Sequence, residues 1–397
     1  MEEAFLLCLG EDGGLRLDEP SQSRRMLEVV CAHGYCVVDI QIEESQAQSP
    51  RLSEWEQCFS SAFALPQETK EAEGVFRNDQ GVALGYRQED QREFLETRVY
   101  RGSKGHGPHV VSPSFAERVT DYDAFVNGIF SILSNAALAV LEVLCMGPGL
   151  DFRCITDLTD LPQSASDKGI DMEISSSLLR ICSYPLVPEL PDALPVPPPN
   201  SMTEPTPPMA SPATSTDPSD AQIVFGSHTD TSFLTIGLLS RTPGLEVLDH
   251  ERGWIKIEEK AAGLPVNPVA GATRTLRAVC FVGEFLQVAT KKYFRALVHK
   301  VRAPAYTAGT TTPRISCPFI IRGRSGAIFD MGNKDKYTHR TGAEAWIPDL
   351  DGISMKVLHK ILDHKRQKVM NDPRPDGTDW YLMSFPEDAN VSTNASF

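Results

Sequence analysis

The sequence predicts a mainly β fold with supporting helices, in the form of a sandwich or a barrel. Three observations support this class. Eight short apolar or alternating runs lie between turn residues in the second half of the chain, and one long apolar helical pattern precedes them. Hydrophobic residues make up 41% of the 397 residues, which is enough for a packed core. Short strands with regular turn signals are typical of sandwiches and barrels.

The first half of the chain is predicted to contain three helices and one strand. A helix and then a strand cover about residues 21–40, with Gly34 between them, because glycine readily ends helices. A second helix covers Ser53 to Ala64, and a polar, glycine-containing stretch without a predicted element follows to about Pro113. The clearest helix covers Asp121 to Met146, where apolar residues recur at helical spacing, so we interpret it as a core support helix.

From residue 178 onward the pattern changes to that of strands. The runs that alternate or are wholly apolar are Leu178–Tyr184, Gln222–Phe225, Phe233–Leu239, Leu245–Leu248, Trp254–Ile257, Ala278–Val282, Ala296–Val301 and Ile315–Ile321. One segment interrupts them, with twelve prolines between Pro185 and Pro218 and no Lys, Arg or His. Such a segment cannot supply the donors of a sheet, so we interpret it as a loop inserted between two strands of one domain.

Charge and cysteine usage favour some partners and compartments over others. The formal net charge is −15, and an acidic chain repels phosphate backbones, so we expect no nucleic-acid partner. The nine cysteines include no Cys-x-x-Cys pair and are expected to be free thiols in a reducing compartment. The first residues lack the basic head of a signal peptide, and no membrane-spanning run is predicted, so we expect a cytoplasmic protein without a membrane partner.

Two segments far apart in the chain carry candidate metal ligands. His228 and Asp230 are two residues apart, so in an extended chain both side chains point to the same side and can reach one metal ion. His299 lies inside an apolar strand, where a histidine without partners is more often a hydrogen-bonded core residue. Two histidines and one carboxylate together make the facial triad that leaves three positions of an iron ion open.

Three further residues are candidates for holding an anionic ligand. Arg314 and Ser316 share one strand face, and a guanidinium matches a carboxylate in bidentate fashion while a serine hydroxyl can add a hydrogen bond. Taken alone, Arg314 is explained equally well as a surface arginine at a strand entrance. Tyr184 can donate its hydroxyl to a bound carboxylate, although an ordinary strand tyrosine is the simpler interpretation.

In this order the motifs resemble those of the isopenicillin-N-synthase-like branch of the iron(II)/2-oxoglutarate dioxygenases. That branch carries His-x-Asp, a distant His and then Arg-x-Ser, which here are His228, Asp230, His299, Arg314 and Ser316. The resemblance covers roughly residues 17–323, with gaps. Supporting segments that resemble the family are Cys31–Tyr35, Phe63–Pro66, Gly244–Leu248, Gly253–Ile255, Phe281–Glu284 and Tyr293–Val301.

The resemblance implies a fold, a cofactor and a reaction. The fold is α+β but mainly β, a double-stranded β-helix or jelly roll with supporting N-terminal helices. Fe(II) would be held by His228, Asp230 and His299, and the distal carboxylate of 2-oxoglutarate by Arg314 and Ser316, with Tyr184 as a further contact. The implied enzyme uses O2 and 2-oxoglutarate to hydroxylate or desaturate a small organic substrate, and it releases succinate and CO2. Neither the substrate nor the oligomeric state is indicated.

Some positions depart from the family pattern, and other functions stay open. Cys182 stands where many relatives have Asn, and Glu284 replaces the usual Asp. An oxidase of the same fold that does not use 2-oxoglutarate can retain Arg314 and Ser316, and a catalytically silent binding protein can retain the fold. A zinc hydrolase is disfavoured, because no His-rich zinc cluster is present in the sequence.

The predicted organisation has four parts. They are an N-terminal region at 1–120, a support helix and connection at 121–174, the jelly-roll core at 175–325 with the proline-rich insert at 186–220, and a C-terminal helix and tail at 326–397 with the helix itself at Ser354 to Met370. The candidates for pocket-lining residues are Phe225, Phe233 and Phe319, although core packing explains each of them equally well.

Overall fold

The computed structural model describes most of the chain in separate ranges. These are residues 4–9, 15–17, 20–42, 52–72, 75–77, 83–89, 92–102, 105–109, 113–147, 152–161, 174–186, 223–249, 251–265, 274–290, 292–303, 312–329 and 352–371. The predicted insert at 186–220 lies, apart from its first residue, outside the described residues. The statements below concern the described ranges.

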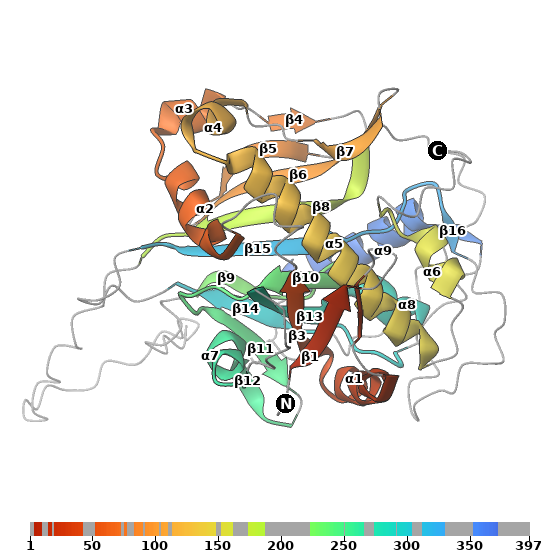
Figure 1. Ribbon diagram of the computed structural model, residues 1–397. Coiled ribbons are helices and arrows are strands. Elements are labelled where there is room, and N and C mark those ends of the chain that lie inside the picture. The colour runs from red at the N-terminus through yellow and green to blue at the C-terminus, as the bar shows by residue number, and fades with distance from the viewer. Residues whose placement is uncertain are drawn as a thin grey trace, which may run out of the picture.

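A large sheet of eleven strands forms the major layer of the molecule (Figure 1). Its strands in spatial order are β2 (Leu15–Leu17), β1 (Phe5–Leu9), β3 (Tyr35–Ile42), β13 (Arg274–Val282), β10 (Leu234–Leu238), β15 (Arg314–Ile321), β8 (Ile174–Tyr184), β6 (Arg92–Gly102), β5 (Ala83–Glu89) and β4 (Val75–Arg77), with β7 (Gly105–His109) also paired to β6. All pairs are antiparallel except β1 with β3. The N-terminal strands therefore extend the same sheet that contains the core strands.

A smaller sheet of four strands forms the second layer. Its order is β12 (Gly253–Lys256), β11 (Leu245–Asp249), β14 (His299–Arg302) and β9 (Ile223–His228), all antiparallel. A two-stranded ribbon of β16 (Ile328–Phe329) and β17 (Ile353–Ser354) lies towards the C-terminus. The major and minor sheets together make the jelly roll, as the resemblance implies.

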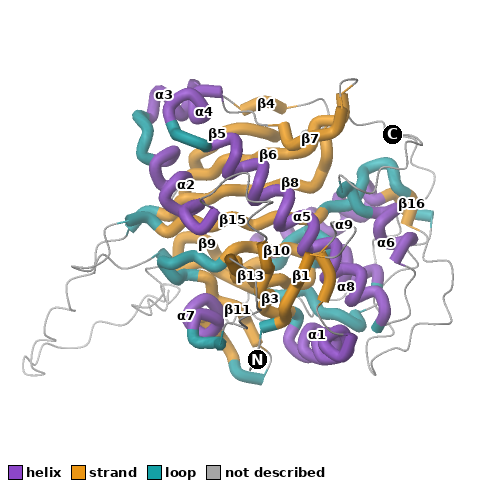
Figure 2. The backbone as a smooth tube through the Cα atoms, viewed as in Figure 1, coloured by secondary structure: helices purple, strands orange, loops and turns teal. Residues whose placement is uncertain are grey.

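The helices are distributed around the sheets (Figure 2). They are α1 (Pro20–His33), the 3-10 turn η2 (Leu52–Glu54), α2 (Trp55–Phe63), α3 (Gln67–Ala72), α4 (Pro113–Arg118), α5 (Tyr122–Met146), α6 (Phe152–Leu158), α7 (Ile257–Ala262), α8 (Glu284–Ala289) and α9 (Met355–Asn371). The predicted helices at 53–64, 121–146 and 354–370 are confirmed to within a residue or two by η2 with α2, by α5 and by α9.

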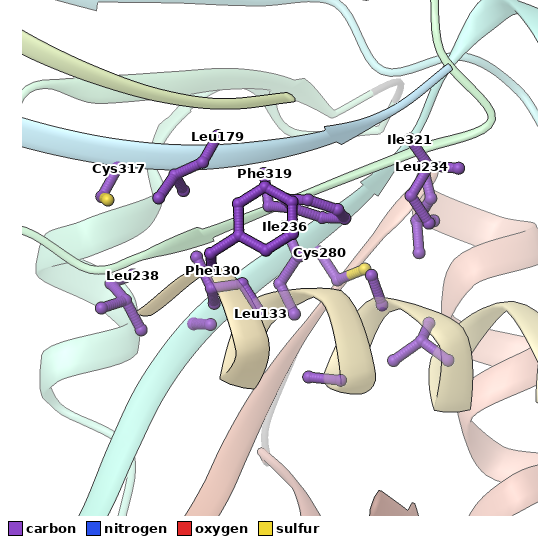
Figure 3. Packing of buried hydrophobic residues seen from close by; sticks show 14 of the residues in the cluster. Phe130, Leu133, Leu179, Leu234, Ile236, Leu238, Cys280, Cys317, Phe319 and Ile321 are labelled. Atoms are coloured by element: carbon purple, nitrogen blue, oxygen red, sulfur yellow. The ribbon is translucent and has the colours of Figure 1, made fainter. Parts of the chain in front are cut away.

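Helix α5 covers the outer face of the major sheet. Phe130 of α5 meets Phe319 of β15 edge to face with ring centroids 5.1 Å apart, and Leu179 and Ile236 lie beside this contact (Figure 3). The predicted role as a core support helix is therefore confirmed. Helix α5 is also long and apolar enough to cross a bilayer, but 67% of its most apolar window is buried inside the protein, as in the core helix of a globular fold.

Strand alternation gives the central strands of the major sheet two different faces. On β15, Cys317 and Phe319 belong to the core under α5, whereas Arg314, Ser316 and Pro318 line a cavity between the two sheets. A period of two residues is what a β-strand dictates. This alternation directs every second side chain of β8, β10, β13 and β15 towards the candidate site.

The eight predicted strands are all present, with ends that differ by up to four residues. The prediction missed β4, β5, β6 and β7, which lie within the polar stretch before Pro113, and the short strands β1, β2, β16 and β17. The pattern of β6 is hidden because it buries charged residues, with Glu96 and Arg98 only 3% and 4% exposed. In a pattern of hydrophobicity, buried ion pairs are indistinguishable from solvated positions, so the sequence predicts an irregular segment where the structure has a central strand.

Helix α9 packs on the core. Met355, Leu358 and Leu362 are buried and belong to the same apolar cluster as α5. This helix therefore packs on the core of its own chain.

Candidate metal and carboxylate site

The two candidate histidines lie directly opposite each other in the minor sheet. His228 on β9 is the antiparallel register partner of His299 on β14, although 70 residues separate them in the sequence. Their imidazole centroids are 4.2 Å apart. The pairing of the two strands, which the sequence does not reveal, thus brings both rings to one point at the cavity wall.

Asp230 completes the cluster from the turn that follows β9. Its Oδ1 lies 3.7 Å from Nε2 of His228 and 3.9 Å from Nε2 of His299. The three ligand atoms all lie within 4.8 Å of one another. Burial by itself raises the pKa of Asp230, but the positive charge that the imidazoles of His299 and His228 carry when protonated, the hydrogen bond from Thr235 and the charge of Arg180 outweigh it, so the pKa lies below its usual value.

Hydrogen bonds fix the orientation of both rings. The Nδ1 atoms of His228 and His299 lie 2.9 Å and 3.2 Å from the carbonyl oxygens of Gly226 and Leu297. A carbonyl oxygen only accepts, so each Nδ1 carries the proton and each Nε2 presents its lone pair. Carbonyl acceptors behind ligating histidines are a common feature of metal centres, because they fix the tautomer and the ring plane.

The turn that carries Asp230 is held by a buried carboxylate of α8. Thr229 and Thr231, on either side of Asp230, donate to Oε1 and Oε2 of Glu284 at 2.7 Å and 3.3 Å. Thr235 donates to Oδ2 of Asp230 at 2.6 Å. Glu284 replaces the usual Asp of the resembled family, and the longer side chain here spans two threonine hydroxyls. The metal-facing carboxylate is therefore positioned from several directions.

Gly283 allows this helix to approach the turn. A Cβ at position 283 would lie 2.1 Å from Oγ of Ser232 and 2.2 Å from its carbonyl oxygen, which no real side chain allows. Any other residue would push α8, and Glu284 with it, away from the turn.

Arg314 lies at the other end of the cavity and is almost fully buried, with 2% of its side chain exposed. Its Nη2 donates to Oε1 of Glu258 on α7 at 2.7 Å, and its Nε lies 3.4 Å from Oε2. Burial by itself lowers the pKa of Arg314, but the carboxylate of Glu258 outweighs it and the guanidinium stays charged. Gly244 provides the space, since a Cβ there would lie 2.7 Å from Cδ of Arg314.

Glu258 is saturated with donors. Besides Arg314, its oxygens accept from the backbone N–H groups of Ser240, Gly244 and Leu245 at 3.1, 2.7 and 2.8 Å. It therefore joins the loop after β10 to the guanidinium. On Arg314, by contrast, Nη1 is buried and has no hydrogen-bond partner among the described residues. A buried donor without an acceptor is costly, so it indicates a place where a ligand oxygen belongs.

Tyr184 and Ser316 lie beside this free donor. Tyr184 is the register partner of Arg314, and its ring centroid is 5.3 Å from the guanidinium carbon. Ser316 pairs with Cys182 one step further along the same two strands, and all four residues line the cavity. Tyr184 is thus buried at the candidate carboxylate position, and Cys182 is the neighbour that departs from the family pattern.

One cavity joins the metal cluster to Arg314. His228, Asp230 and His299 line it at one end and Arg314 lines it at the other. Of the three phenylalanines predicted to line a pocket, Phe225 does so. Phe319 does not, because it points to the opposite face of β15 and packs against Phe130 of α5, and Phe233, just before β10, packs against Phe285 of α8.

The residues present fit a divalent metal. Two neutral imidazole nitrogens and one ionised carboxylate converge from one side, and the cavity on the other side leaves room for further ligands. This donor set is the 2-His-1-carboxylate arrangement of non-haem Fe(II) sites.

Several residues of the site were not predicted from the sequence. Arg180 was within reach, because it has the same strand parity as Tyr184 and therefore faces the same cavity. Arg92 lies on β6, which was not predicted at all, and Phe281 was assigned only to a strand. No sequence pattern pointed to Glu258, because it lies in a six-residue helix whose neighbouring residues form no recognisable motif.

Comparisons with known proteins agree with this geometry. Residues 207–323 match the family model of the 2OG-Fe(II) oxygenase superfamily. The fold is similar to that of a full-length Neurospora crassa protein solved in complex with alpha-KG and 5-formyluracil, with a TM-score of 0.56 and 16% identity over 90% of this chain and 98% of that chain. It is also similar to a putative 2OG-Fe(II) oxygenase family protein from Caulobacter crescentus, with a TM-score of 0.55 and 19% identity over 87% and 94%.

Among curated proteins the similarity is local. A stretch of 84 residues is 36% identical to 1-aminocyclopropane-1-carboxylate oxidase homolog 9 of Arabidopsis thaliana, and it covers 21% of this chain and 19% of that protein. The chain thus matches about a fifth of the length of this curated relative. The jelly roll with two histidines and a carboxylate at one end defines a class of non-haem metal oxygenase folds. Residues 207–323 are the part of the chain that matches the 2OG-Fe(II) oxygenase superfamily, and the fold is similar to that of the two solved structures named above.

Proposed function

We propose that this protein is an Fe(II)- and 2-oxoglutarate-dependent dioxygenase that hydroxylates or desaturates a small organic substrate. The observation that carries the proposal is the position of His228, Asp230 and His299 at one end of a cavity that has a buried guanidinium at the other end. Bound Fe(II) and 2-oxoglutarate would supply the activation of O2 for substrate oxidation, with succinate and CO2 as products.

The residues of the metal end act by presenting ligands without rearrangement. His228 and His299 offer Nε2 lone pairs because their Nδ1 protons are held by carbonyl oxygens. Asp230 offers Oδ1, while Thr235 keeps Oδ2 occupied. This division favours binding through a single carboxylate oxygen, which leaves more of the coordination sphere open for other ligands.

The residues of the other end act by holding a carboxylate. Nη1 of Arg314 is buried and without an acceptor among the described residues, the ring of Tyr184 lies 5.3 Å from the guanidinium carbon, and Ser316 lines the same cavity. A carboxylate oxygen at this point would satisfy Nη1 in a site closed to water, where a charge-assisted hydrogen bond is strong. The apolar wall between the two ends, which includes Phe281 and Val301, keeps the connecting space dry.

Release of labelled CO2 from 2-oxoglutarate tests the proposal. The full chain, loaded with Fe(II) under anaerobic conditions and then exposed to O2 and a metabolite library, should release CO2 and form succinate in response to a substrate. His228→Ala should abolish this release, and Arg314→Ala should raise the concentration of 2-oxoglutarate that is required. Succinate formation that survives His228→Ala would contradict the assignment.

An oxidase of the same fold that does not use 2-oxoglutarate is the second candidate. Glu258 already occupies Nη2 of Arg314, so a co-substrate would find a single free nitrogen instead of a guanidinium fork. Oxidation of a substrate with O2 but without release of CO2 from labelled 2-oxoglutarate would favour this candidate over the dioxygenase.

A further inference from the structure

The cavity-facing side of β8 carries a second cationic group, the guanidinium of Arg180. Tyr184, Cys182 and Arg180 alternate along this strand, and all three line the cavity. Tyr184 lies at the Arg314 end. Arg180 is four residues away, about 13 Å along an extended strand, and Asp230 of the metal cluster lines the same cavity. The cavity therefore offers two separate positions for an anion, one at Arg314 beside Tyr184 and one at Arg180.

Positive charge is in excess around Arg180. The buried carboxylate of Glu96 on β6 is approached by three guanidiniums, with Arg180 at 2.5 Å, Arg87 at 2.8 Å and Arg98 at 3.6 Å. Burial and the charge of Arg322 lower the pKa of Arg98 to about 9, which shows how crowded the positive charges are. Asp230 of the metal cluster also acts on Arg180, so two carboxylates face three cations, and the remaining positive charge favours a further anion.

Arg180 has a donor to offer such an anion. Its Nε and Nη2 both donate to Oε1 of Glu96, at 2.8 Å and 2.5 Å. Among the described residues, none accepts from its Nη1. Glu96 thus holds the guanidinium by one edge, and the side chain remains 20% exposed and lines the cavity.

An aromatic surface adjoins a second guanidinium of the cavity, that of Arg92. Arg92, also on β6, lies with its guanidinium carbon 3.7 Å from the ring centroid of Phe225 and lines the same cavity. The rings of Phe225 and Phe281 lie 4.0 Å and 4.7 Å from those of His228 and His299. The space next to the metal cluster is therefore bounded by two arginines and two phenylalanines.

We propose that the substrate is a small organic acid whose carboxylate binds Arg180 and Arg92 and whose ring or apolar part lies against Phe225 and Phe281. The inference rests on the proposed function in one respect, since it takes the metal end of the cavity as the place of substrate oxidation. It adds a chemical class of substrate. Aromatic and arginine side chains in combination suit a planar anion, which gains a charge-assisted hydrogen bond and ring stacking together.

Binding of matched acid and amide probes tests the inference without turnover. The probes are benzoate, phenylacetate and cinnamate with their primary amides, measured by saturation-transfer NMR on the metal-free full chain and by calorimetry with Fe(II) and 2-oxoglutarate under anaerobic conditions. At least one acid should bind about tenfold or more tightly than its amide. Arg180→Gln should remove this preference, and Arg180→Lys should retain part of it. Arg92→Gln should weaken it, and the exposed Arg118→Gln should leave it unchanged.

Other outcomes overturn the inference. Equal binding of acids and amides, or no binding of any acid, would contradict it. An acid preference that survives Arg180→Gln would also contradict it. So would a loss of affinity for 2-oxoglutarate in Arg180→Gln without any change in the binding of the acids, because Arg180 would then bind the co-substrate. Thermal unfolding of each variant identifies those that fail to fold. The release of CO2 from labelled 2-oxoglutarate is a separate measurement, so its absence would refute the proposed function without affecting the binding result.

Discussion

The guanidinium of Arg314 is already paired with a carboxylate of its own chain, that of Glu258, at 2.7 Å in a position where both side chains are 2% exposed. Glu258 also accepts three backbone N–H groups, so it is part of the frame and not a movable group. This pair leaves one nitrogen of Arg314 for a ligand. Glu258 is therefore a positioning residue for the proposed co-substrate anchor.

Replacement of Glu258 by Gln should destabilise the protein and change its response to 2-oxoglutarate. A buried guanidinium that loses its partner costs about 3 kcal/mol or more in the free energy of unfolding. The dianion 2-oxoglutarate can supply a carboxylate to that guanidinium, so it should raise the melting temperature more in the variant than in the wild type. Differential scanning fluorimetry with and without 2-oxoglutarate measures both effects.

The neighbouring Glu259→Gln is the matched control for this variant. Glu259 is 51% exposed and pairs with Lys256 at the surface, so the melting temperature and its dependence on 2-oxoglutarate should stay close to those of the wild type. Equal stabilisation of wild type and Glu258→Gln by 2-oxoglutarate would show that Arg314 does not hold the co-substrate.

The contrast between Arg314 and Glu258 also shows which residues of the site can be predicted from the sequence. Arg314, His228, Asp230 and His299 were found because strand parity and their order in the chain limit where they can point. Glu258 was not found, because its importance comes from a contact with a residue 56 positions away that no local pattern encodes.

The same reasoning applies to the fold. The core strands have apolar alternation that is visible in the sequence, and each was predicted. Strand β6 was missed because its inward positions include Glu96 and Arg98, whose burial depends on mutual pairing. Phe319 failed as a pocket residue because residue type does not reveal which face of β15 meets α5, and Phe233 failed because its contact with Phe285 of α8 is not encoded locally.

Removal of a single ligand should abolish metal binding. Asp230→Asn replaces an ionised ligand by a neutral amide, and His299→Ala removes an imidazole, so each should weaken the affinity for Fe(II) by about 100-fold or more. Anaerobic calorimetry with Fe(II), or titration with Co(II) followed by absorbance, measures the loss. Asp123→Asn, at an exposed position on α5, is the control and should bind as the wild type does. Unchanged affinity in both ligand variants would place the metal elsewhere.

Glu284 should contribute to metal affinity without touching the metal. Its carboxylate holds the hydroxyls of Thr229 and Thr231 on either side of Asp230. Glu284→Gln keeps one acceptor oxygen and loses the other, so the turn should loosen and the affinity for Fe(II) should fall by about 10- to 100-fold. The exposed Glu117→Gln on α4 is the control. A loss of stability with unchanged metal affinity would assign Glu284 a purely structural role.

The stability that Glu96 provides should depend on pH in a defined direction. Burial by itself raises the pKa of Glu96, but Arg180, Arg98 and Arg87 outweigh it, so the pKa in the folded protein lies below the ordinary value of 4.5. A carboxyl group with a lowered pKa contributes stability that is fully present above its unfolded pKa and is lost as the pH falls through the folded one.

Comparison of Glu96→Gln with the wild type tests this directly. At pH 7 the variant should be less stable by about 3 kcal/mol, because three guanidiniums lose their shared carboxylate. Below pH 4.5 the gap should narrow, because the unfolded wild-type chain binds a proton there that the folded protein binds only at the lower pKa of the folded state. Urea denaturation followed by circular dichroism at several pH values gives the two free energies of unfolding. A gap that stays constant into the acid range would mean that the carboxylate charge does not stabilise the arginine cluster.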